Sequence, residues 1–160
     1  TTPGYCWYNN DEVNHKVVYG ALYNWYAVNT GKLCPDGWHV PTHDEWKQME
    51  MNLGMSQEEA DKEHLRGTDE GYKLKAISGW NSVEGYYDGN GDNSSGFSAF
   101  PVGIRWDTGE FSGLGYNGIW GTATDDGIMV YCRVLLDWTS QIDFNQYPKT
   151  TGFAIRCLQD

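Results

Sequence analysis

Short apolar runs separated by glycines fill the chain beyond residue 67, and this pattern constrains the fold more than any other feature. Runs of this length, bounded by turn residues, are typical of β-strands. They cover residues 96–106, 109–115, 118–126, 128–138 and 152–160. The first part of the chain instead carries apolar residues at helical spacing. Helices that precede a succession of strands indicate an α+β fold.

Three helices are predicted in that first part. Residues 17–28 are apolar on nearly all sides, which predicts a buried helix. Thr42 and Glu45 have the spacing of a capping box, so a helix is expected over 43–53. The same pattern recurs before a shorter helix over 57–65.

His39 and His43 have the H-x-x-x-H spacing of helical zinc sites. That spacing brings both rings to one metal only when both histidines lie on one helix. Pro41 and the Thr42 cap place His39 before the helix, so we do not predict zinc. We expect His43 to be solvated in the first turn and His39 to be partly buried and hydrogen-bonded.

Composition excludes several classes of partner. The formal net charge of the 160 residues is −11, with no cluster of Lys or Arg. Nucleic-acid binding needs a basic surface, so no nucleic acid is expected. No run of 18 apolar residues occurs, so the chain is not expected to insert into a membrane. Aromatic residues make up 15% of the chain, which is typical of a folded domain.

Asp88, Asn90 and Asp92 alternate with glycines in a segment that begins like an EF-hand loop. Asn93 and Ala99 stand where an EF-hand has Gly and Glu, so the segment is not an EF-hand. Two interpretations stay open: a looser calcium-binding loop, and an ordinary loop of Gly, Asn and Asp turns. Calcium is the only cofactor that the sequence suggests.

No catalytic motif is found. Ser98 lacks the second glycine of G-x-S-x-G and is expected to begin a strand. Residues 137–151 are predicted to form a loop in which Trp138, Phe144 and Tyr147 stand among small polar residues. Aromatic rings in such a setting resemble binding surfaces. Trp120 fits a core position in the preceding strand region.

The four cysteines are Cys6, Cys34, Cys132 and Cys157, and none forms a C-x-x-C pair. Four cysteines allow three pairings, between which spacing alone does not choose. Alternation along residues 129–137 predicts that Val130, Cys132, Val134 and Leu136 are buried.

Four segments together resemble the Fibrobacter succinogenes major paralogous domain family. They are YGALYNWYAVNTGKLCPDGWHVPTHDEW, SGFSAFPVGIR, IWGTAT and GFAIRCLQD, and they occur in the family's order over nearly the whole chain. Family members usually begin earlier, so residues 1–160 are interpreted as one domain that lacks the usual N-terminal segment. VPTHDEW and the closing GFAIRC more distantly resemble C-type-lectin-like and formylglycine-generating-enzyme folds. This resemblance implies a C-type-lectin-like domain with two to three helices, a small twisted antiparallel sheet and long loops.

The resemblance also implies a Cys34–Cys157 disulfide, because the last strand of such folds returns beside the first. A disulfide implies an exported protein, secreted or at the cell surface. The paired catalytic cysteines of formylglycine-generating enzymes and the calcium-site motifs of sugar-binding lectins are both absent. Neither activity is therefore carried over.

Some proteins of this fold are variable proteins of diversity-generating retroelements. In the resembling family, the positions of Cys132, Val134, 136–139 and 143–151 are those that vary. This implies that Cys132, Val134 and Leu136 lie on an exposed face while Arg133 points inward, paired with a carboxylate. Alternation predicts that these three side chains are buried, whereas the resemblance implies that they are exposed. We follow the resemblance.

The chain is therefore predicted to be a non-catalytic adhesin or receptor-binding module of a bacterial or phage-encoded protein. Its expected ligand is a protein or glycan on a cell or host surface, bound through 119–126, 132–138 and 143–151. The candidate contact residues are Trp120, Cys132, Val134, Leu136, Asp137, Trp138, Asp143, Phe144 and Tyr147. The alternatives are an enzyme on the formylglycine-generating-enzyme-like scaffold and a purely structural surface module.

Overall fold

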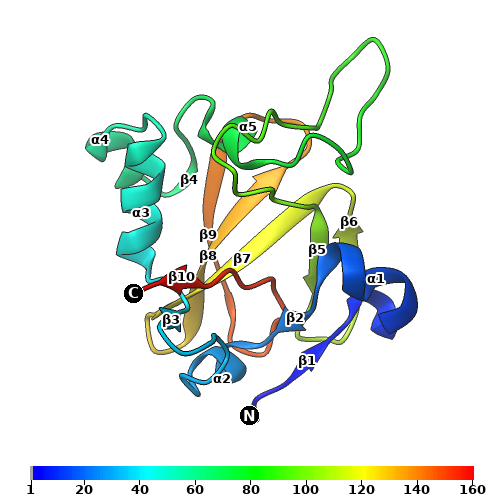
Figure 1. Cartoon of the computed structure of the whole chain (residues 1–160), viewed down its shortest axis with the longest axis vertical. Coiled ribbons are helices and arrows are strands. Elements are labelled where there is room, and N and C mark those ends of the chain that lie inside the picture. The colour runs from blue at the N-terminus through cyan, green and yellow to red at the C-terminus, as the bar shows by residue number, and fades with distance from the viewer. Residues whose placement is uncertain (1) are drawn as a thin grey trace.

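A six-stranded sheet forms the centre of the structure, a computed structural model that describes residues 2–160 (Figure 1). The strands lie in the order β4-β9-β8-β7-β5-β6. They are β4 (His64–Arg66), β5 (Val102–Arg105), β6 (Phe111–Leu114), β7 (Asn117–Asp125), β8 (Met129–Leu136) and β9 (Ile142–Pro148). Helices precede most of these strands in the chain, so the predicted α+β class is confirmed.

The sheet is mixed, whereas an antiparallel sheet was expected. β6 folds back along the outer edge of β5, and β7 then pairs with the inner edge of β5 in the same direction, with Gly103 opposite Gly118. All other neighbouring strands are antiparallel. β5 is also shorter than the predicted strand over 96–106. Ser98 lies in a loop with φ of 55°, so the expectation that it begins a strand is wrong.

β9 corrects the prediction of a loop over 137–151. Its residues pair with β8 on one side, where Phe144 lies opposite Arg133, and with β4 on the other. Ile142 and Phe144 are buried, and the alternate residues Asp143 and Asn145 are half-buried. Asp, Asn and Gln have low strand propensity, so this half-buried strand was hidden by its composition.

The predicted helix over 17–28 is divided into separate elements. These are α1 (Glu12–Tyr19), β2 (Leu22–Tyr23) and α2 (Trp25–Val28). Gly20 ends α1 with a φ of +71°, which glycine adopts at little cost. The Asn24 side chain then accepts a hydrogen bond from the Ala27 N–H at 3.0 Å and so begins α2. The apolar run therefore belongs to a helix, a strand and a second helix.

α3 (His43–Asn52) has the predicted bounds to within a residue and lies along one side of the sheet (Figure 1). Its capping box is formed: the Glu45 N–H donates to Thr42 Oγ1 at 3.3 Å, and the Thr42 N–H donates to Glu45 Oε2 at 2.8 Å. Beyond it, α4 (Gln57–Ala60) is shorter than the predicted 57–65, and α5 (Glu70–Leu74) was not predicted. The described chain thus has five α-helices rather than two to three.

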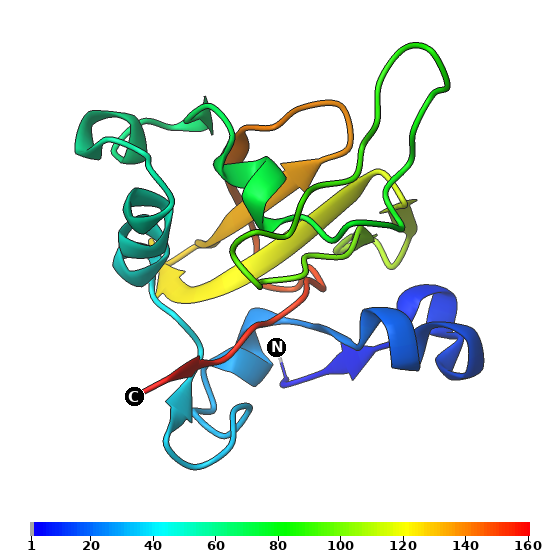
Figure 2. The same cartoon turned by 45° about the horizontal axis from the view of Figure 1, so that its top comes forward.

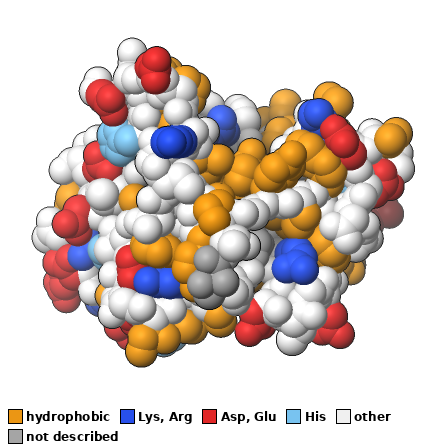
Figure 3. Space-filling view, turned by 90° about the horizontal axis from the view of Figure 1, so that it is seen from below, with side chains coloured by type: hydrophobic (Ala, Val, Ile, Leu, Met, Phe, Trp, Pro, Cys, Tyr) orange, Lys and Arg blue, Asp and Glu red, His pale blue; other side chains and the backbone are white. Residues whose placement is uncertain are grey.

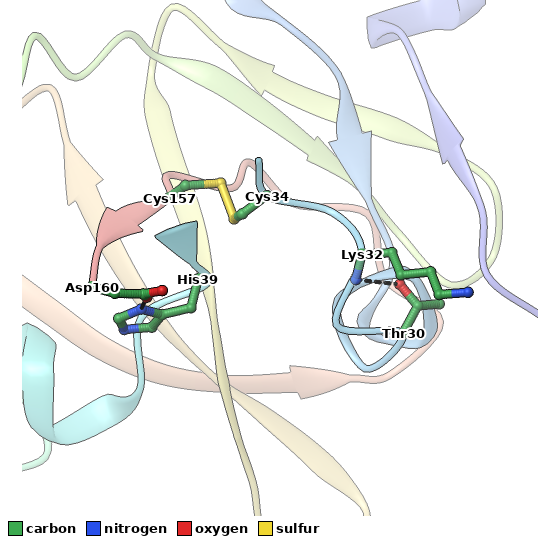
Figure 4. Close-up of a disulfide and its surroundings, with 6 residues drawn as sticks. All are labelled: Thr30, Lys32, Cys34, His39, Cys157 and Asp160. Carbon is green, nitrogen blue, oxygen red and sulfur yellow. Dashed lines mark hydrogen bonds and ion pairs between the residues drawn. A yellow bond between two sulfur atoms is a disulfide. The ribbon is translucent and has the colours of Figure 1, made fainter. Parts of the chain in front are cut away.

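Two short ladders and a disulfide organise the N-terminal part of the chain and join it to the C-terminal segment. After a short 3-10 turn, Tyr8–Asn10, and α1, β2 pairs with β1 (Tyr5–Cys6). β10 (Leu158–Gln159) pairs with β3 (Trp38–His39). Cys34 and Cys157 form the disulfide beside this ladder (Figure 4), with Cα atoms 5.8 Å apart. The pairing implied by the family resemblance is confirmed.

Both faces of the sheet are covered, and each face has its own apolar cluster. Trp46, Leu74, Trp120, Leu135 and Ile142 belong to the cluster on the helix side. The other cluster contains Ile104, Ile119, Val130, Cys132, Val134 and Phe153. The parity that alternation predicts for Val130, Cys132 and Val134 is therefore correct, and the exposure implied by the resemblance is wrong. Leu136, at the end of the strand, is half-buried.

Three fully buried charged side chains join α3 to the sheet. Arg133 on β8 points inward, as the resemblance implied, and its Nε donates to Glu50 Oε1 at 2.5 Å. Arg66 on β4 donates from Nη2 to both Glu50 oxygens, at 3.1 and 3.0 Å. The ring of Phe144 packs on both guanidinium groups, at 5.4 and 5.1 Å from its centroid. One carboxylate thus compensates two buried arginines.

His43 belongs to the same cluster and is half-buried, so the expectation that it is solvated is wrong. Its Nδ1 lies 3.1 Å from Arg133 Nη1. Burial, together with the positive charges of Arg133, Lys47 and Arg66, lowers the pKa of His43 to about 4. The ring is therefore neutral at pH 7. Nδ1 accepts the hydrogen bond from Arg133, which assigns the ring proton to Nε2.

Loss of the Glu50 carboxylate should strongly destabilise the fold. Glu50→Gln leaves two buried guanidinium groups without a counter-charge, which costs about 3–5 kcal/mol of unfolding free energy. Urea unfolding measures this loss, with the exposed Glu58→Gln on α4 as the matched control. Replacing Glu50, Arg66 and Arg133 together by Met should recover much of the stability. A Glu50→Gln variant as stable as the wild type would show that the cluster is not needed.

The disulfide should contribute through its loop of 123 residues. In the chain-entropy account, a loop of this length stabilises a fold by about 4–5 kcal/mol. A Cys34→Ser, Cys157→Ser double variant should therefore unfold at a much lower urea concentration than Cys6→Ser, which removes a free thiol. Non-reducing peptide mapping that recovers Cys34 and Cys157 as free thiols contradicts the assignment.

Candidate ligand-binding surface

Four exposed aromatic side chains lie on α5 and on three loops at one end of the sheet. These segments are in the upper part of Figure 1. Tyr72 is 41% exposed on α5, Tyr86 is 87% exposed on the long α5–β5 connection, and Tyr116 is 59% exposed between β6 and β7. Trp138 is 58% exposed between β8 and β9. We call Tyr72, Tyr86, Tyr116 and Trp138 the aromatic end. The α5–β5 connection, residues 75–101, projects beyond the sheet in both Figures 1 and 2.

Backbone hydrogen bonds hold these loops against one another. The Asp137 N–H donates to the Tyr116 carbonyl at 2.9 Å, and the Tyr72 N–H donates to the Ser140 carbonyl at 3.1 Å. Within the long connection, the Asn81 N–H donates to the Gly115 carbonyl at 2.8 Å. Four separate stretches of the chain therefore present their exposed rings from one connected frame.

Lys75 lies beneath the aromatic end and is 2% exposed. Its Nζ donates to the Thr139 carbonyl at 2.8 Å and lies 4.9 Å from the centroid of the Trp80 ring. Burial lowers the pKa of Lys75 to about 8, although the carboxylates of Asp137 and Asp88 act in the opposite direction. The ammonium group ties the turn between β8 and β9 to the start of the long connection.

Asp137 is 5% exposed, so its carboxylate faces inward instead of toward a ligand. It accepts a hydrogen bond from the Tyr87 hydroxyl at 3.0 Å, which raises the pKa of that phenol. The carboxylate thereby holds the part of the long connection in which Tyr87 pairs with Val83. Asp137 was predicted to contact the ligand. The structure instead places it beneath the aromatic end, where it supports the loops.

The other predicted contact residues are mostly inaccessible. Trp120, Cys132, Val134 and Phe144 are each at most 7% exposed, because both faces of β7, β8 and β9 are covered. Three further candidates are half-buried: Leu136, Asp143 and Tyr147. Burial raises the pKa of Asp143. Trp138 alone among the nine predicted residues is largely exposed. Elsewhere in the predicted segments 119–126 and 143–151, the exposed residues are Ala123, Asp126, Gln146 and Thr150. The predicted surface therefore keeps scattered exposed positions, but only one of its nine named contact residues is largely exposed.

The sequence matches the family model described as Fibrobacter succinogenes major domain over residues 1–159. The chain belongs to the Fibrobacter succinogenes major domain family. The resemblance inferred from the sequence is confirmed. No curated protein and no solved structure matches this chain significantly. These comparisons therefore do not indicate a ligand or an activity.

Three rings of the aromatic end were missed in the sequence of this family member: Tyr72, Tyr86 and Tyr116. Tyr86 and Tyr116 each stand next to a glycine in turn-rich sequence, which was the available signal of loop exposure. Tyr72 also follows a glycine, Gly71, but it lies in a helix that the sequence did not indicate, so this signal did not reveal its exposure. Its exposure depends on how α5 meets the β8–β9 turn.

The predicted calcium residues take part in local turns. Asp88 accepts hydrogen bonds from the Ser82 hydroxyl at 2.7 Å and the Asn90 N–H at 3.0 Å, and Asp92 accepts from the Ser94 N–H at 2.9 Å. Asn90 Oδ1 accepts from the Trp80 N–H at 3.1 Å. Residues 2–160 contain no group of three or more His, Cys, Asp or Glu side chains placed to hold a metal. Calcium binding through Asp88, Asn90 and Asp92 stays a prediction.

Two side chains that could take part in catalysis, Cys132 and His39, are engaged in structural contacts. Burial raises the pKa of the Cys132 thiol far above its usual range, and its Sγ lies 3.8 Å from the Val130 carbonyl. His39 lies between two carboxylates. Its Nδ1 is 2.6 Å from Asp160 (Figure 4), and its Nε2 is 2.8 Å from Glu45. These hydrogen bonds raise the pKa of His39. The predicted hydrogen-bonded state of His39 is confirmed.

The pKa of Lys75 predicts a specific dependence of stability on pH. The pKa is about 8 in the folded chain and about 10.4 in an unfolded one, so the unfolded state binds more protons between these values. Lys75 therefore opposes folding below pH 8, and this opposition is relieved as the pH rises. The unfolding free energy of wild type minus that of Lys75→Met should rise by up to about 3 kcal/mol from pH 7.5 to 10.5. Urea titrations at stepped pH measure it, and parallel curves for both proteins contradict the assignment.

Proposed function

We propose that this domain is a non-catalytic ligand-binding module that contacts its ligand through the aromatic end. The observation that carries the proposal is the concentration of four exposed aromatic rings, one on α5 and three on loops, at one end of the sheet. Tyr and Trp supply large contact area at a low cost in side-chain entropy, and for this reason they dominate binding surfaces. A C-type-lectin-like arrangement, in which loops at one end of a mixed sheet form the binding surface, is the finer fold that we propose.

Rigid presentation supports this proposal. The loops are joined by hydrogen bonds between backbone groups and rest on the buried Lys75 and Asp137. A surface that is ordered before binding loses less entropy when the ligand arrives. The rings of the aromatic end can then contribute affinity without first arranging their loops.

Charge narrows the ligand class. Glu84, Asp88 and Asp92 are exposed on the long connection. The lysines nearby are engaged, since Lys73 pairs with Asp69 at 2.8 Å and Lys75 is buried. The aromatic end is therefore bordered by uncompensated carboxylates, which disfavours anionic ligands. We propose a neutral glycan or a protein surface with neutral or basic residues.

We further propose that the parent protein is bacterial or phage-encoded and exported, and that the ligand lies on a cell or host surface. The Cys34–Cys157 disulfide supports export, because such bonds persist in oxidising compartments. Among residues 2–160, no helix has the length and apolarity to cross a membrane.

If a retroelement diversifies this domain, only some of the positions expected to vary can alter its surface. Trp138 is exposed and Thr139 half-buried in the β8–β9 turn, so substitutions there change the surface. Cys132 and Val134 lie in the second apolar cluster, where substitutions change packing. If this domain is a variable protein, the proposal confines useful variation to the turn and its neighbouring loops.

Single ring truncations test the aromatic end. Trp138→Ala and Tyr116→Ala should each weaken capture of the ligand at least about tenfold, because central aromatic anchors carry most of the energy of an interface. The ligand is first selected from a glycan array and a panel of bacterial and host surface proteins. Melting temperatures should change by less than about 4 °C, since both side chains are largely exposed.

Tyr5→Ala is the matched control. Tyr5 is 65% exposed on β1, which lies at the opposite end of the molecule from the α5–β5 connection (Figure 1). The view from below shows a band of hydrophobic side chains on that face (Figure 3). Equal loss of capture in Tyr5→Ala and Trp138→Ala, or undiminished capture by both ring variants of the aromatic end, would place the binding site elsewhere.

A further inference from the structure

Two adjacent cavities lie along the C-terminal segment, away from the aromatic end. One has a volume of about 460 Å³ and the other about 380 Å³. Residues 154–156 line the first and residues 156–158 the second. The facing wall also belongs to one stretch of chain, with Ser98 and Phe100 in the first cavity and residues 95–97 in the second. The two cavities are therefore successive parts of one groove between residues 154–158 and 95–100.

Arg156 divides this groove. It lines both cavities, its Nη2 donates to the Phe97 carbonyl on the facing wall, and its guanidinium carbon lies 4.6 Å from the centroid of the Phe97 ring. No ion pair joins Arg156 to a carboxylate within residues 2–160. Arg66 and Arg133, in contrast, share Glu50. Arg156 is thus an exposed arginine without a carboxylate partner in the described chain, placed between two cavities.

The side chains around Arg156 are largely apolar. Tyr19, Phe100 and Trp120 line the larger cavity, and Trp46, Met49, Leu53, Phe97 and Leu158 line the smaller one. Glu45 also lines the smaller cavity, but its carboxylate is bound by Thr42 and His39. A ligand that fits both cavities therefore has apolar groups that pack on these side chains, an acceptor group between them, and polar atoms for the polar groups that the larger cavity also exposes.

Backbone groups along this groove also lack partners. No backbone hydrogen bond within residues 2–160 is made by Ile155, Arg156 or Cys157, between the bridge at Ala154 and β10. Unpaired main-chain groups in such a stretch are open to pairing with another strand.

We propose that this groove binds an extended peptide segment of a partner protein, with apolar side chains in the two cavities and a carboxylate on Arg156. The free backbone groups of residues 155–157 favour a peptide over a small amphiphilic acid, because strand addition uses main-chain donors and acceptors. The carboxylate replaces the Phe97 carbonyl as the partner of Arg156, since charge-assisted hydrogen bonds are the stronger kind. Two apolar anchors flanking one acidic group define the recognition pattern.

Fluorescence anisotropy with labelled hexapeptides tests the proposal. The peptides carry blocked ends and a central Asp between two apolar pairs drawn from Val, Leu, Ile and Phe, and a matched set carries Asn instead of Asp. Wild-type protein should bind Asp peptides at least tenfold more tightly than their Asn partners. Asn peptides with a free C-terminal carboxylate form a third set, which distinguishes a side-chain carboxylate from a chain end.

Variants of the arginine decide the assignment. Arg156→Gln should remove the preference for Asp, and Arg156→Lys should keep part of it, because lysine retains the charge but not the planar fork. Arg105→Gln is the matched control, since Arg105 also has no carboxylate partner within residues 2–160 and packs on Phe111, outside the groove. The proposal fails if no peptide binds at millimolar concentration, if Asp and Asn peptides bind equally, or if Arg105→Gln removes the preference as Arg156→Gln does. Trp138→Ala should leave peptide binding unchanged, which separates this groove from the aromatic end.

Discussion

The carboxylate of Glu50 is the interaction on which the rest of the structure depends. It binds Arg133 on β8 and Arg66 on β4, and thereby fixes α3 against two strands that are not neighbours in the sheet. Since two buried arginines share one carboxylate, the cluster needs further compensation, which the ring of Phe144 and the neutral imidazole of His43 supply. Arg66 still has two buried nitrogen atoms, Nε and Nη1, without acceptors in the described chain. Such a cluster tolerates little rearrangement, so it specifies how helix and sheet meet.

Features determined by neighbouring residues could be predicted from the sequence. The capping box of Thr42 and Glu45 defines the start of α3 because both hydrogen bonds are made within one turn. Alternation along β8 gave the burial of Val130, Cys132 and Val134, because the strand's own side chains determine it. The Cys34–Cys157 pairing needed the family resemblance, because long-range pairing has no local signal.

Features determined by distant segments could not be predicted. Alternation alone cannot show that a second cluster covers the Cys132 face, so the resemblance to exposed, variable positions prevailed there and was wrong. β9 is a strand because β8 and β4 pair with it on both sides, which overrides the low propensity of Asp, Asn and Gln. For the candidate site, Trp138 was found because its loop setting is local. Tyr72 was missed, because its exposure follows from the packing of α5 on the β8–β9 turn.

The aromatic end is held almost entirely through main-chain groups. The bonds Asp137 to Tyr116, Tyr72 to Ser140 and Asn81 to Gly115 all join backbone atoms, and Lys75 binds the carbonyl of Thr139. A side chain at Tyr72, Tyr116 or Trp138 can therefore change without removing the hydrogen bonds that position its loop. The supporting side chains, Lys75 and Asp137, are buried and make no contact that depends on the identity of the exposed rings. This separation between a fixed frame and replaceable surface side chains is the physical requirement for one scaffold to present different binding surfaces.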